Sequence, residues 1–195
     1  MRIKSVIFDL DGTITRPFFD FDVIREEIGL APDAGSILEV METMTPDERK
    51  RAEEILKVHE DQAVNESVLN DSARETIELL RQRSIDIGIL TRNKKTNALA
   101  IADKHNLEFD AIIDREDGPV KPNAFGVLRL CEHFKTKPAE TLVVGDFLYD
   151  LLSAKAAGAI AVLLKTHQNS EEFREHADFE ISSLDEILQI IEDKK

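Results

Sequence analysis

Two aspartates one residue apart, Asp9 and Asp11, directly follow an apolar run in the stretch SVIFDLDGTITRP. The run Val6-Ile7-Phe8 predicts a buried strand, and because Asp and Gly are poor strand residues, that strand should end where the acids begin. A carboxylate at the end of a strand can attack phosphorus as a nucleophile. The dipeptide Asp11-Gly12 is also common in ordinary turns, so the pair alone does not establish a reaction.

Polar residues also follow other predicted strands of the chain. If the strands are parallel, their carboxyl ends meet at one edge of the sheet, where ligands bind in open α/β folds. Taken singly, each residue has a structural explanation, such as a helix cap, a turn or a solvated loop. Their joint occurrence after successive strands favours a functional site. Besides Asp9 and Asp11, these residues are Thr91, Arg92, Lys121, Asp146 and Asp150.

Four carboxylates gathered in a partly buried place repel one another unless they take up protons or bind a cation. Oxygen ligands without His or Cys favour a hard cation, and a few carboxylates with open positions suit Mg²⁺ together with phosphate oxygens. The Thr91 hydroxyl, at the predicted start of a helix, and the Lys121 ammonium both suit a phosphate group. We therefore expect Mg²⁺ as the cofactor and attack on phosphorus by a carboxylate.

The elements that must position these residues alternate between strands and helices. Six short runs rich in Ile, Val and Phe are nearly continuous in hydrophobicity, as expected of buried parallel strands. Helical patterns lie between them, so we predict an α/β fold, a three-layer Rossmann-like core with a mainly parallel sheet. The predicted strands are Ile3–Phe8, Ile85–Leu90, Phe109–Ile113, Thr141–Val144, Ala159–Leu164 and Phe179–Ile181. The predicted helices of the core are Asp71–Gln82, Lys95–His105, Asn123–Phe134, Leu148–Ala157 and Leu184–Glu192.

The alternation fails over residues 16–70, where only helical patterns occur. Within this segment, Thr45-Pro46-Asp47-Glu48 has the composition of a strong helix start. We therefore expect a small all-helical cap, residues 16–70, inserted after the first strand into a catalytic core formed by residues 1–15 and 71–195. The predicted cap helices are Phe21–Ile28, Ser36–Met44 and one from Thr45 to near Ala63.

The composition narrows the range of partners and compartments. The formal net charge of −14, from 25 Lys+Arg against 39 Asp+Glu, argues against nucleic acid or an anionic membrane as a partner, since both need a basic surface. Cys131 stands alone, so no intramolecular disulfide is expected. The N-terminus lacks the layout of a signal peptide, and no apolar stretch approaches the ~18 residues of a membrane span. We expect a cytoplasmic protein, a monomer or weak homodimer, that acts on a small molecule.

Four motifs in chain order resemble those of the haloacid dehalogenase superfamily of phosphotransferases, and the likeness covers nearly the whole chain. The extended stretches ILTRN (residues 89–93) and GDFLYDLLSAKAAG (residues 145–158) also look like this family. A helical insertion just after the first motif is similar to the phosphoglycolate phosphatase and β-phosphoglucomutase branch, although this insertion is short for that branch. The motifs are Asp9-Leu10-Asp11-Gly12-Thr13, Thr91, Lys121, and Gly145-Asp146 with Asp150.

The resemblance implies a division of labour between the two acids of the opening stretch. Asp9 would be the nucleophile that forms an aspartyl-phosphate and gives one oxygen to Mg²⁺. Asp11 would protonate the leaving alcohol and then activate the water that hydrolyses the intermediate, while its backbone carbonyl binds the metal. Such a split is physically reasonable if a metal keeps Asp9 ionised and leaves the Asp11 carboxyl free.

The resemblance also implies roles for the residues after the other strands. Thr91, helped by backbone N–H groups around Arg92, would hold a phosphoryl oxygen of a small-molecule phosphate ester. Lys121 would neutralise Asp9 and the phosphate. Asp146 would ligate Mg²⁺, with Asp150 beside it as a ligand or as a support for the ligands.

Three functions are compatible with these residues. The leading one is a Mg²⁺-dependent phosphatase for a small phosphate monoester. A phosphomutase of the β-phosphoglucomutase type would use the same site but would have to exclude water, which a small cap makes harder. A non-catalytic module that binds Mg²⁺ and phosphate is the third, although such a binder has no need for an acid at Asp11.

Overall fold

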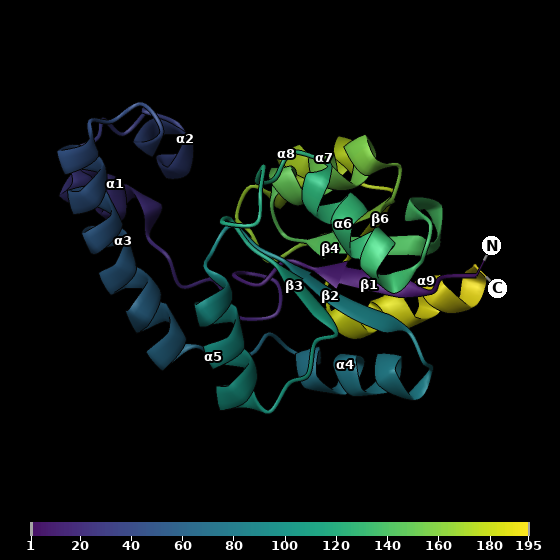
Figure 1. Ribbon diagram of the computed structural model, residues 1–195. Helices are drawn as coiled ribbons and strands as arrows, with labels where there is room; N and C mark the ends of the chain where they lie inside the picture. Colours follow the sequence, from purple (N-terminus) through teal and green to yellow (C-terminus); the bar gives the residue numbers. More distant parts are fainter. Residues whose placement is uncertain (1, 195) are drawn as a thin grey trace. The chain divides into compact units, whose positions relative to one another are not determined.

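The computed structural model describes residues 2–194, and its main element is a six-stranded sheet in the order β3-β2-β1-β4-β5-β6. Every neighbouring pair of strands is parallel, which confirms the predicted α/β core with a parallel sheet. Figure 1 shows β1 in the middle of the sheet, as its place in the strand order requires. The strands are β1 (Ser5–Phe8), β2 (Asp86–Leu90), β3 (Ala111–Ile113), β4 (Thr141–Gly145), β5 (Ile160–Leu164) and β6 (Phe179–Ile181).

The register of the central strands places their carboxyl ends at the same level. Phe8 at the end of β1 pairs with Ile89 on β2 and with Val144 on β4. The residues that follow these three strands therefore begin at one edge of the sheet. This edge also contains the point where the strand order reverses, since β2 and β3 extend from β1 on one side while β4, β5 and β6 extend on the other. In open α/β sheets, ligands bind at such a reversal.

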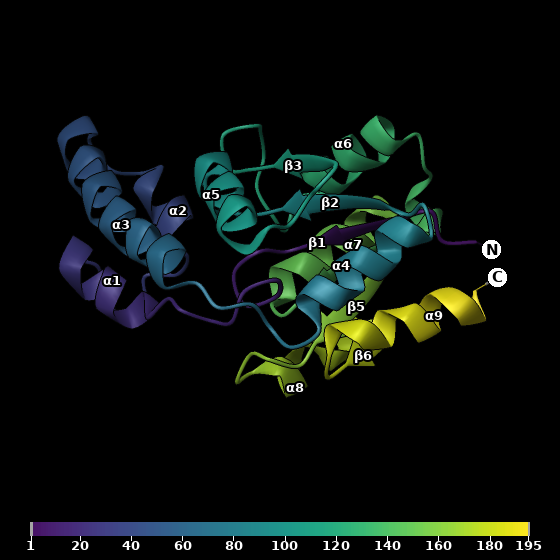
Figure 2. The ribbon, with the colours of Figure 1, turned by 90° about the horizontal axis from the view of Figure 1, so that it is seen from below.

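Helices cover both faces of the sheet and form the outer layers. Figures 1 and 2 show α4, α5 and α9 on one face and α6 and α7 on the other. The helices α4, α5, α6 and α7, which connect successive strands, lie where right-handed crossovers from a central β1 require. The helices of this part are α4 (Ala73–Gln82), α5 (Lys95–His105), α6 (Phe125–Phe134), α7 (Leu148–Ala157), α8 (Ser170–Phe173) and α9 (Ile187–Asp193), with short 3-10 turns at Pro138–Glu140, Arg174–His176 and Leu184–Glu186.

The core explains why the strands have continuous apolar runs. Val6, Ile7 and Phe8 are fully buried because both faces of β1 are covered. Ile7 packs in one cluster with Leu130 of α6 and Leu151 of α7. Gly126 at the start of α6 lies so close to the sheet that a Cβ there would come within 2.2 Å of Leu90 Cδ1. Tight helix-on-sheet packing thus holds the strand ends in place.

The predicted boundaries differ from the observed ones mainly at element ends. The predicted helix Leu184–Glu192 begins instead as a 3-10 turn over Leu184–Glu186, where the Glu186 carboxylate accepts bonds from the backbone N–H groups of Ser182 and Ser183. These bonds tighten the first turn, and α9 starts at Ile187. The short helix α8 (Ser170–Phe173) was not predicted, because four residues are too few for a helical periodicity to show.

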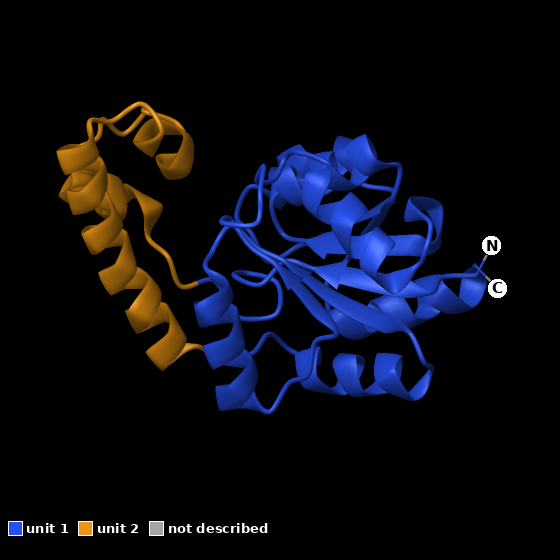
Figure 3. Ribbon diagram, in the orientation of Figure 1, with its two compact units in different colours: residues 1–17, 68–195 blue, residues 18–67 orange. Residues whose placement is uncertain are grey.

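Residues 18–67 form a second compact unit, separate from the unit of residues 1–17 and 68–195 (Figure 3). Thr45 caps its longest helix, and the predicted capping box is present: the Thr45 hydroxyl accepts from the Glu48 N–H, and the Glu48 carboxylate accepts from the Thr45 N–H. The unit has its own small core around Ile24, Met41 and Leu56. Its helices are α1 (Phe21–Ile28), α2 (Ile37–Met41) and α3 (Pro46–Glu66).

The chain segments that leave and return to the larger unit are bonded to each other. The Arg16 N–H donates to the Val68 carbonyl at 2.8 Å, and the Asn70 N–H donates to the Ile14 carbonyl at 2.9 Å. Thr15 and Leu69 form an antiparallel bridge between them. We call these paired residues, 14–16 and 68–70, the clasp.

Among residues 2–194, no helix is long and apolar enough to cross a membrane.

The core of the helical unit makes a prediction about α3. Leu56 is 6% exposed and packs in that core, whereas Val58 on the same helix is 65% exposed. Replacing Leu56 with Ala should lower the free energy of unfolding of this unit by about 2–4 kcal/mol, because it deletes buried methyl groups and leaves a cavity. Hydrogen exchange of the α3 amides measures this loss. Val58→Ala is the matched control, and equal losses from both variants would contradict the described core.

Candidate active site

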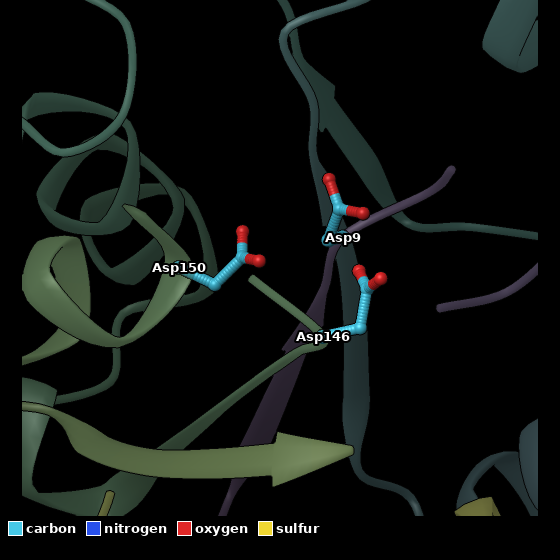
Figure 4. Close-up of side chains that lie close together, drawn as sticks. All are labelled: Asp9, Asp146 and Asp150. Atoms are coloured by element: carbon cyan, nitrogen blue, oxygen red, sulfur yellow. The ribbon is translucent and has the colours of Figure 1, made fainter. Parts of the chain in front are cut away.

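Three buried carboxylates lie together at the ends of β1 and β4. Asp9 continues the line of β1, since its N–H donates to the Val144 carbonyl at 2.9 Å. Asp146 directly follows β4, and Asp150 lies in the first turn of α7. One carboxylate oxygen from each residue lies within 4.8 Å of the others, and Figure 4 shows the three groups around a common space. The structure thus brings together three of the four predicted acids.

Lys121 holds this acidic group together. Its Nζ lies 2.5 Å from Asp9 Oδ1 and 2.6 Å from Asp150 Oδ1, and its side chain is 5% exposed. Burial alone would lower the pKa of Lys121, but the charges of Asp150 and Asp9 outweigh burial and raise the pKa above its usual value. The side chain of Lys121 therefore carries its positive charge between these two carboxylates.

One ammonium cannot neutralise three carboxylates. Burial raises the pKa of Asp9 well above its usual range; Lys121 lowers that pKa, and Asp150, Asp146 and Asp11 raise it further. Burial, followed by the charge of Asp150, raises the pKa of Asp146 to about 7. Without a further cation, Asp9 and Asp146 retain protons that an exposed carboxylate would lose.

The donor set fits a hard divalent cation. Carboxylate oxygens are the ligands that Mg²⁺ prefers, and a positive ion among them would oppose both the burial and the repulsion that raise the pKa values of Asp9 and Asp146. Asp9 and Asp146 bring two such carboxylate oxygens within 4.8 Å of each other at the sheet edge. Asp150 is more fully engaged by the protein, since its Oδ1 accepts from Lys121 and its Oδ2 accepts from the Phe147 N–H at 3.1 Å.

Asp11 lies outside the three-carboxylate group found among residues 2–194. Its side chain is only half-buried, and its Oδ2 accepts a bond from the side-chain amide of Asn93 at 3.2 Å. The sequence predicted four acids gathered at this edge, and the resemblance implied that Asp11 contacts the metal through its backbone carbonyl and not through its carboxyl. The structure separates its carboxyl from the other three, because the turn after β1 points it toward the residues that follow β2.

Thr91 and Arg92 follow β2 at the same edge. Thr91 is buried, and its Oγ1 accepts from the Asn93 N–H at 3.0 Å. The helix α5 begins at Lys95, as predicted, so the Thr91 hydroxyl lies in the loop before this helix and not at its cap. The Arg92 side chain instead supports Lys121, since its Nη1 donates to the Lys121 carbonyl at 2.7 Å and its guanidinium lies 5.0 Å from the centre of the Tyr149 ring.

Several residues that hold Asp146 and the turn after β1 in place were not predicted from the sequence. The Thr13 hydroxyl donates to Asp146 Oδ1 at 3.2 Å and thereby fixes that carboxylate. The Asn70 side-chain amide donates to the carbonyls of Gly12, Thr13 and Thr15, and the Thr166 hydroxyl donates to the carbonyl of Gly12. Thr13 belonged to a quoted motif but had no assigned partner. Asn70 and Thr166 are distant in sequence from the turn after β1 and carried no local signal.

Gly12 allows this turn to approach Asp146. Its φ of +95° is a conformation that favours glycine, and a Cβ at this position would lie 2.4 Å from Asp146 Oδ2. The Asp11-Gly12 pair is therefore both a turn and part of the site.

A family model described as haloacid dehalogenase-like hydrolase matches residues 36–158, more than half of the chain. The chain belongs to this family. An uncharacterized hydrolase of Saccharomyces cerevisiae is 31% identical over 200 residues, covering 98% of this chain and 92% of the relative.

Two other relatives of this haloacid dehalogenase-like hydrolase have names that state a reaction. A phosphoglycolate phosphatase of Chromobacterium violaceum is 25% identical, covering 83% of this chain and 84% of the relative. A pyrophosphatase of Bacillus mycoides is 25% identical, covering 98% of each chain. The fold is matched by the crystal structure of a hydrolase from Pseudomonas syringae, with a TM-score of 0.82, 20% identity, and coverage of 97% of this chain and 98% of the other.

The turn after β1 makes a testable prediction. Gly12→Ala should destabilise the protein in two ways: through strain at positive φ, and through a clash between the new methyl group and Asp146. Gly158→Ala is the matched control, because Gly158 has a φ of +76° but no atom within 4 Å of the position of a Cβ. The clash should make Gly12→Ala less stable than the control by at least about 1 kcal/mol, measured by chemical denaturation. Equal stability of the two variants would show that Asp146 is not held against Gly12.

Proposed function

We propose that this haloacid dehalogenase-like hydrolase is a Mg²⁺-dependent phosphatase that hydrolyses a small-molecule phosphate monoester through an aspartyl-phosphate at Asp9. The observation that carries the proposal is the ammonium of Lys121 between Asp9 and Asp150, beside Asp146, with the Asp11 carboxyl kept apart. This arrangement supplies a nucleophile, a compensating cation and a separate proton carrier. The phosphatase named among the relatives supports the same reaction class.

In the first step, an Asp9 oxygen attacks phosphorus and the bond from phosphorus to the leaving oxygen breaks. The proton on Asp11 passes to that oxygen, so the product leaves as an alcohol. Lys121 stabilises the negative charge that develops on the transferring group, and the Thr91 hydroxyl donates to one of its oxygens. Backbone N–H groups around Arg92 complete the phosphoryl site.

In the second step, water hydrolyses the aspartyl-phosphate. The Asp11 carboxylate takes a proton from the water as the water oxygen bonds to phosphorus. The bond from phosphorus to the Asp9 oxygen breaks, inorganic phosphate forms, and both Asp9 and the protonated Asp11 are restored for another cycle.

The residues that would hold Mg²⁺ are Asp9, Asp146 and the backbone carbonyl of Asp11. Bound there, the ion would supply positive charge to the phosphoryl oxygens. We assign Asp150 to the support of this set, because its two oxygens already accept bonds from Lys121 and from the Phe147 N–H. Asp146 is oriented by Thr13.

The helical unit is assigned the role of a cap that selects the leaving group. It belongs to the segment of residues 16–70, which the sequence presents as an insertion after the first motif. We include in the proposal a cytoplasmic location and a monomer or weak homodimer, both expected from the sequence.

The proposal is tested by the release of inorganic phosphate from a panel of phosphate monoesters and pyrophosphate in the presence of Mg²⁺. Asp9→Asn should lower kcat by at least about 10³-fold, because it removes the nucleophile. Asp11→Asn should lower kcat by about 10²–10⁴-fold, because it removes general acid–base catalysis. Asp103→Asn, on the exposed side of α5, is the control and should retain wild-type activity.

Two outcomes would overturn this assignment. If the wild-type protein turns over no ester but still binds Mg²⁺, the protein is a binding module. If it isomerises a sugar phosphate and releases little phosphate, it is a mutase.

Metal dependence is tested separately, by stability. Mg²⁺ at 100 times its dissociation constant should stabilise the wild-type protein by about 2.7 kcal/mol, because the ion binds only the folded state. Asp146→Asn should abolish this stabilisation, whereas Asp103→Asn should preserve it. Thermal unfolding with and without Mg²⁺ measures the effect. Full phosphatase activity in the presence of EDTA would contradict the proposed metal.

A further inference from the structure

Asn93 connects two functional groups of the proposed site. It is buried in the loop between β2 and α5 and is two residues beyond Thr91. Its backbone N–H donates to Thr91 Oγ1 at 3.0 Å, and its side-chain Nδ2 donates to Asp11 Oδ2 at 3.2 Å. One residue therefore contacts both the hydroxyl assigned to the phosphoryl group and the carboxyl assigned to proton transfer.

The orientation of the Asn93 amide is fixed by its other bonds. Its Oδ1 accepts from the Lys94 N–H at 2.7 Å and from Asn97 Nδ2 at 2.8 Å. Both partners are donors, so the oxygen of the amide must face them and the nitrogen must face Asp11. A flipped amide would oppose donors with donors and place its oxygen against a carboxylate. The backbone and α5 thus aim a donor at Asp11.

Such a fixed donor constrains the rotamer of Asp11. The Asp11 side chain is only half-buried, so packing alone leaves it more freedom than its buried neighbour Asp9 has. Proton transfer requires the acid within hydrogen-bond reach of the leaving oxygen, and small errors in position reduce the rate strongly. The shared attachment to Asn93 fixes the distance between the proton carrier and the phosphoryl-binding hydroxyl.

We infer that Asn93 is a positioning residue. It holds the Asp11 carboxyl at a fixed position relative to the Thr91 hydroxyl, from which Asp11 can transfer a proton to the leaving oxygen. This inference rests on the proposed phosphatase function. It predicts that the loss of the Asn93 donor matters most when the leaving group needs a proton.

Asn93→Asp preserves the acceptor for Lys94 and Asn97, deletes the donor to Asp11 and places a carboxylate oxygen that repels Asp11 in its stead. Asn93→Ala is the second variant; it deletes the donor without adding a charge. Thr96→Ala, exposed on the first turn of α5, is the control for changes at this helix start. Thermal unfolding and the stabilisation by Mg²⁺ show whether each variant retains its fold and its acidic group.

The readout is kcat/KM for two esters that differ in leaving group. The first is the alkyl phosphate of the panel with the highest kcat/KM, and the second is p-nitrophenyl phosphate, whose leaving group departs without a proton. Both Asn93 variants should lower kcat/KM for the alkyl ester by about 10- to 100-fold, a part of the whole general-acid contribution. For p-nitrophenyl phosphate the loss should stay below about 3-fold, since kcat/KM does not include the later hydrolysis of the intermediate.

A double-mutant cycle completes the test. In the Asp11→Asn background, adding Asn93→Asp should lower kcat/KM for the alkyl ester by less than about 2-fold, because Asn93 acts through Asp11. Equal losses for both esters, or additive losses in the cycle, would show a merely structural role and overturn the inference. Wild-type activity of folded Asn93→Asp would overturn it as well and would leave the phosphatase proposal intact. Absence of turnover in the wild-type protein would overturn both.

Discussion

The buried ion pairs of Lys121 with Asp9 and Asp150 are the interaction on which the rest of the site depends. Burying carboxylates costs free energy, and a single ammonium offsets only part of that cost. Because of the remaining negative charge, the carboxylates at the ends of β1 and β4 favour binding a cation or keeping a proton. The same Lys121 must be held firmly, and Arg92 does so through the Lys121 carbonyl. The cluster costs folding free energy, but it places a buried ammonium and buried carboxylates together, as the proposed phosphoryl transfer requires.

The sheet makes this cluster possible, because it brings together residues that are more than a hundred positions apart in sequence. Asp9 follows the central strand, and Asp146 follows its neighbour β4 at the point where the strand order reverses. Since the register of β1, β2 and β4 is level, the loops after them start at the same height. Helices on both faces lock the strands. The core therefore determines where the loops begin, and loop residues such as Lys121 and Asn93 complete the site.

The parts of the site visible in the sequence are those with a local signal. Continuous apolar runs reveal buried strands, and polar residues directly after them, such as Asp9 and Asp146, are placed by the parallel topology alone. Thr13, Asn70 and Asn93 were not assigned roles, because each acts through a partner that the chain brings close only after folding. The side chain of Arg92 is a similar case: the sequence analysis used only the backbone N–H groups around it, and its contacts with Lys121 and Tyr149 form only in the folded chain. The short helix α8 and the 3-10 turns were not predicted for a different reason. Each has only three or four residues, which are too few for a helical periodicity to show.

The clasp of residues 14–16 and 68–70 closes the base of the helical insertion by backbone bonds of its own. With the two ends already joined, the cost of accommodating a longer or shorter insertion grows only slowly with its length. The turn that carries Asp11 and Gly12 is thereby insulated from changes in what lies beyond the clasp. The inserted helices can therefore vary in length or sequence while the backbone bonds beneath this turn stay the same.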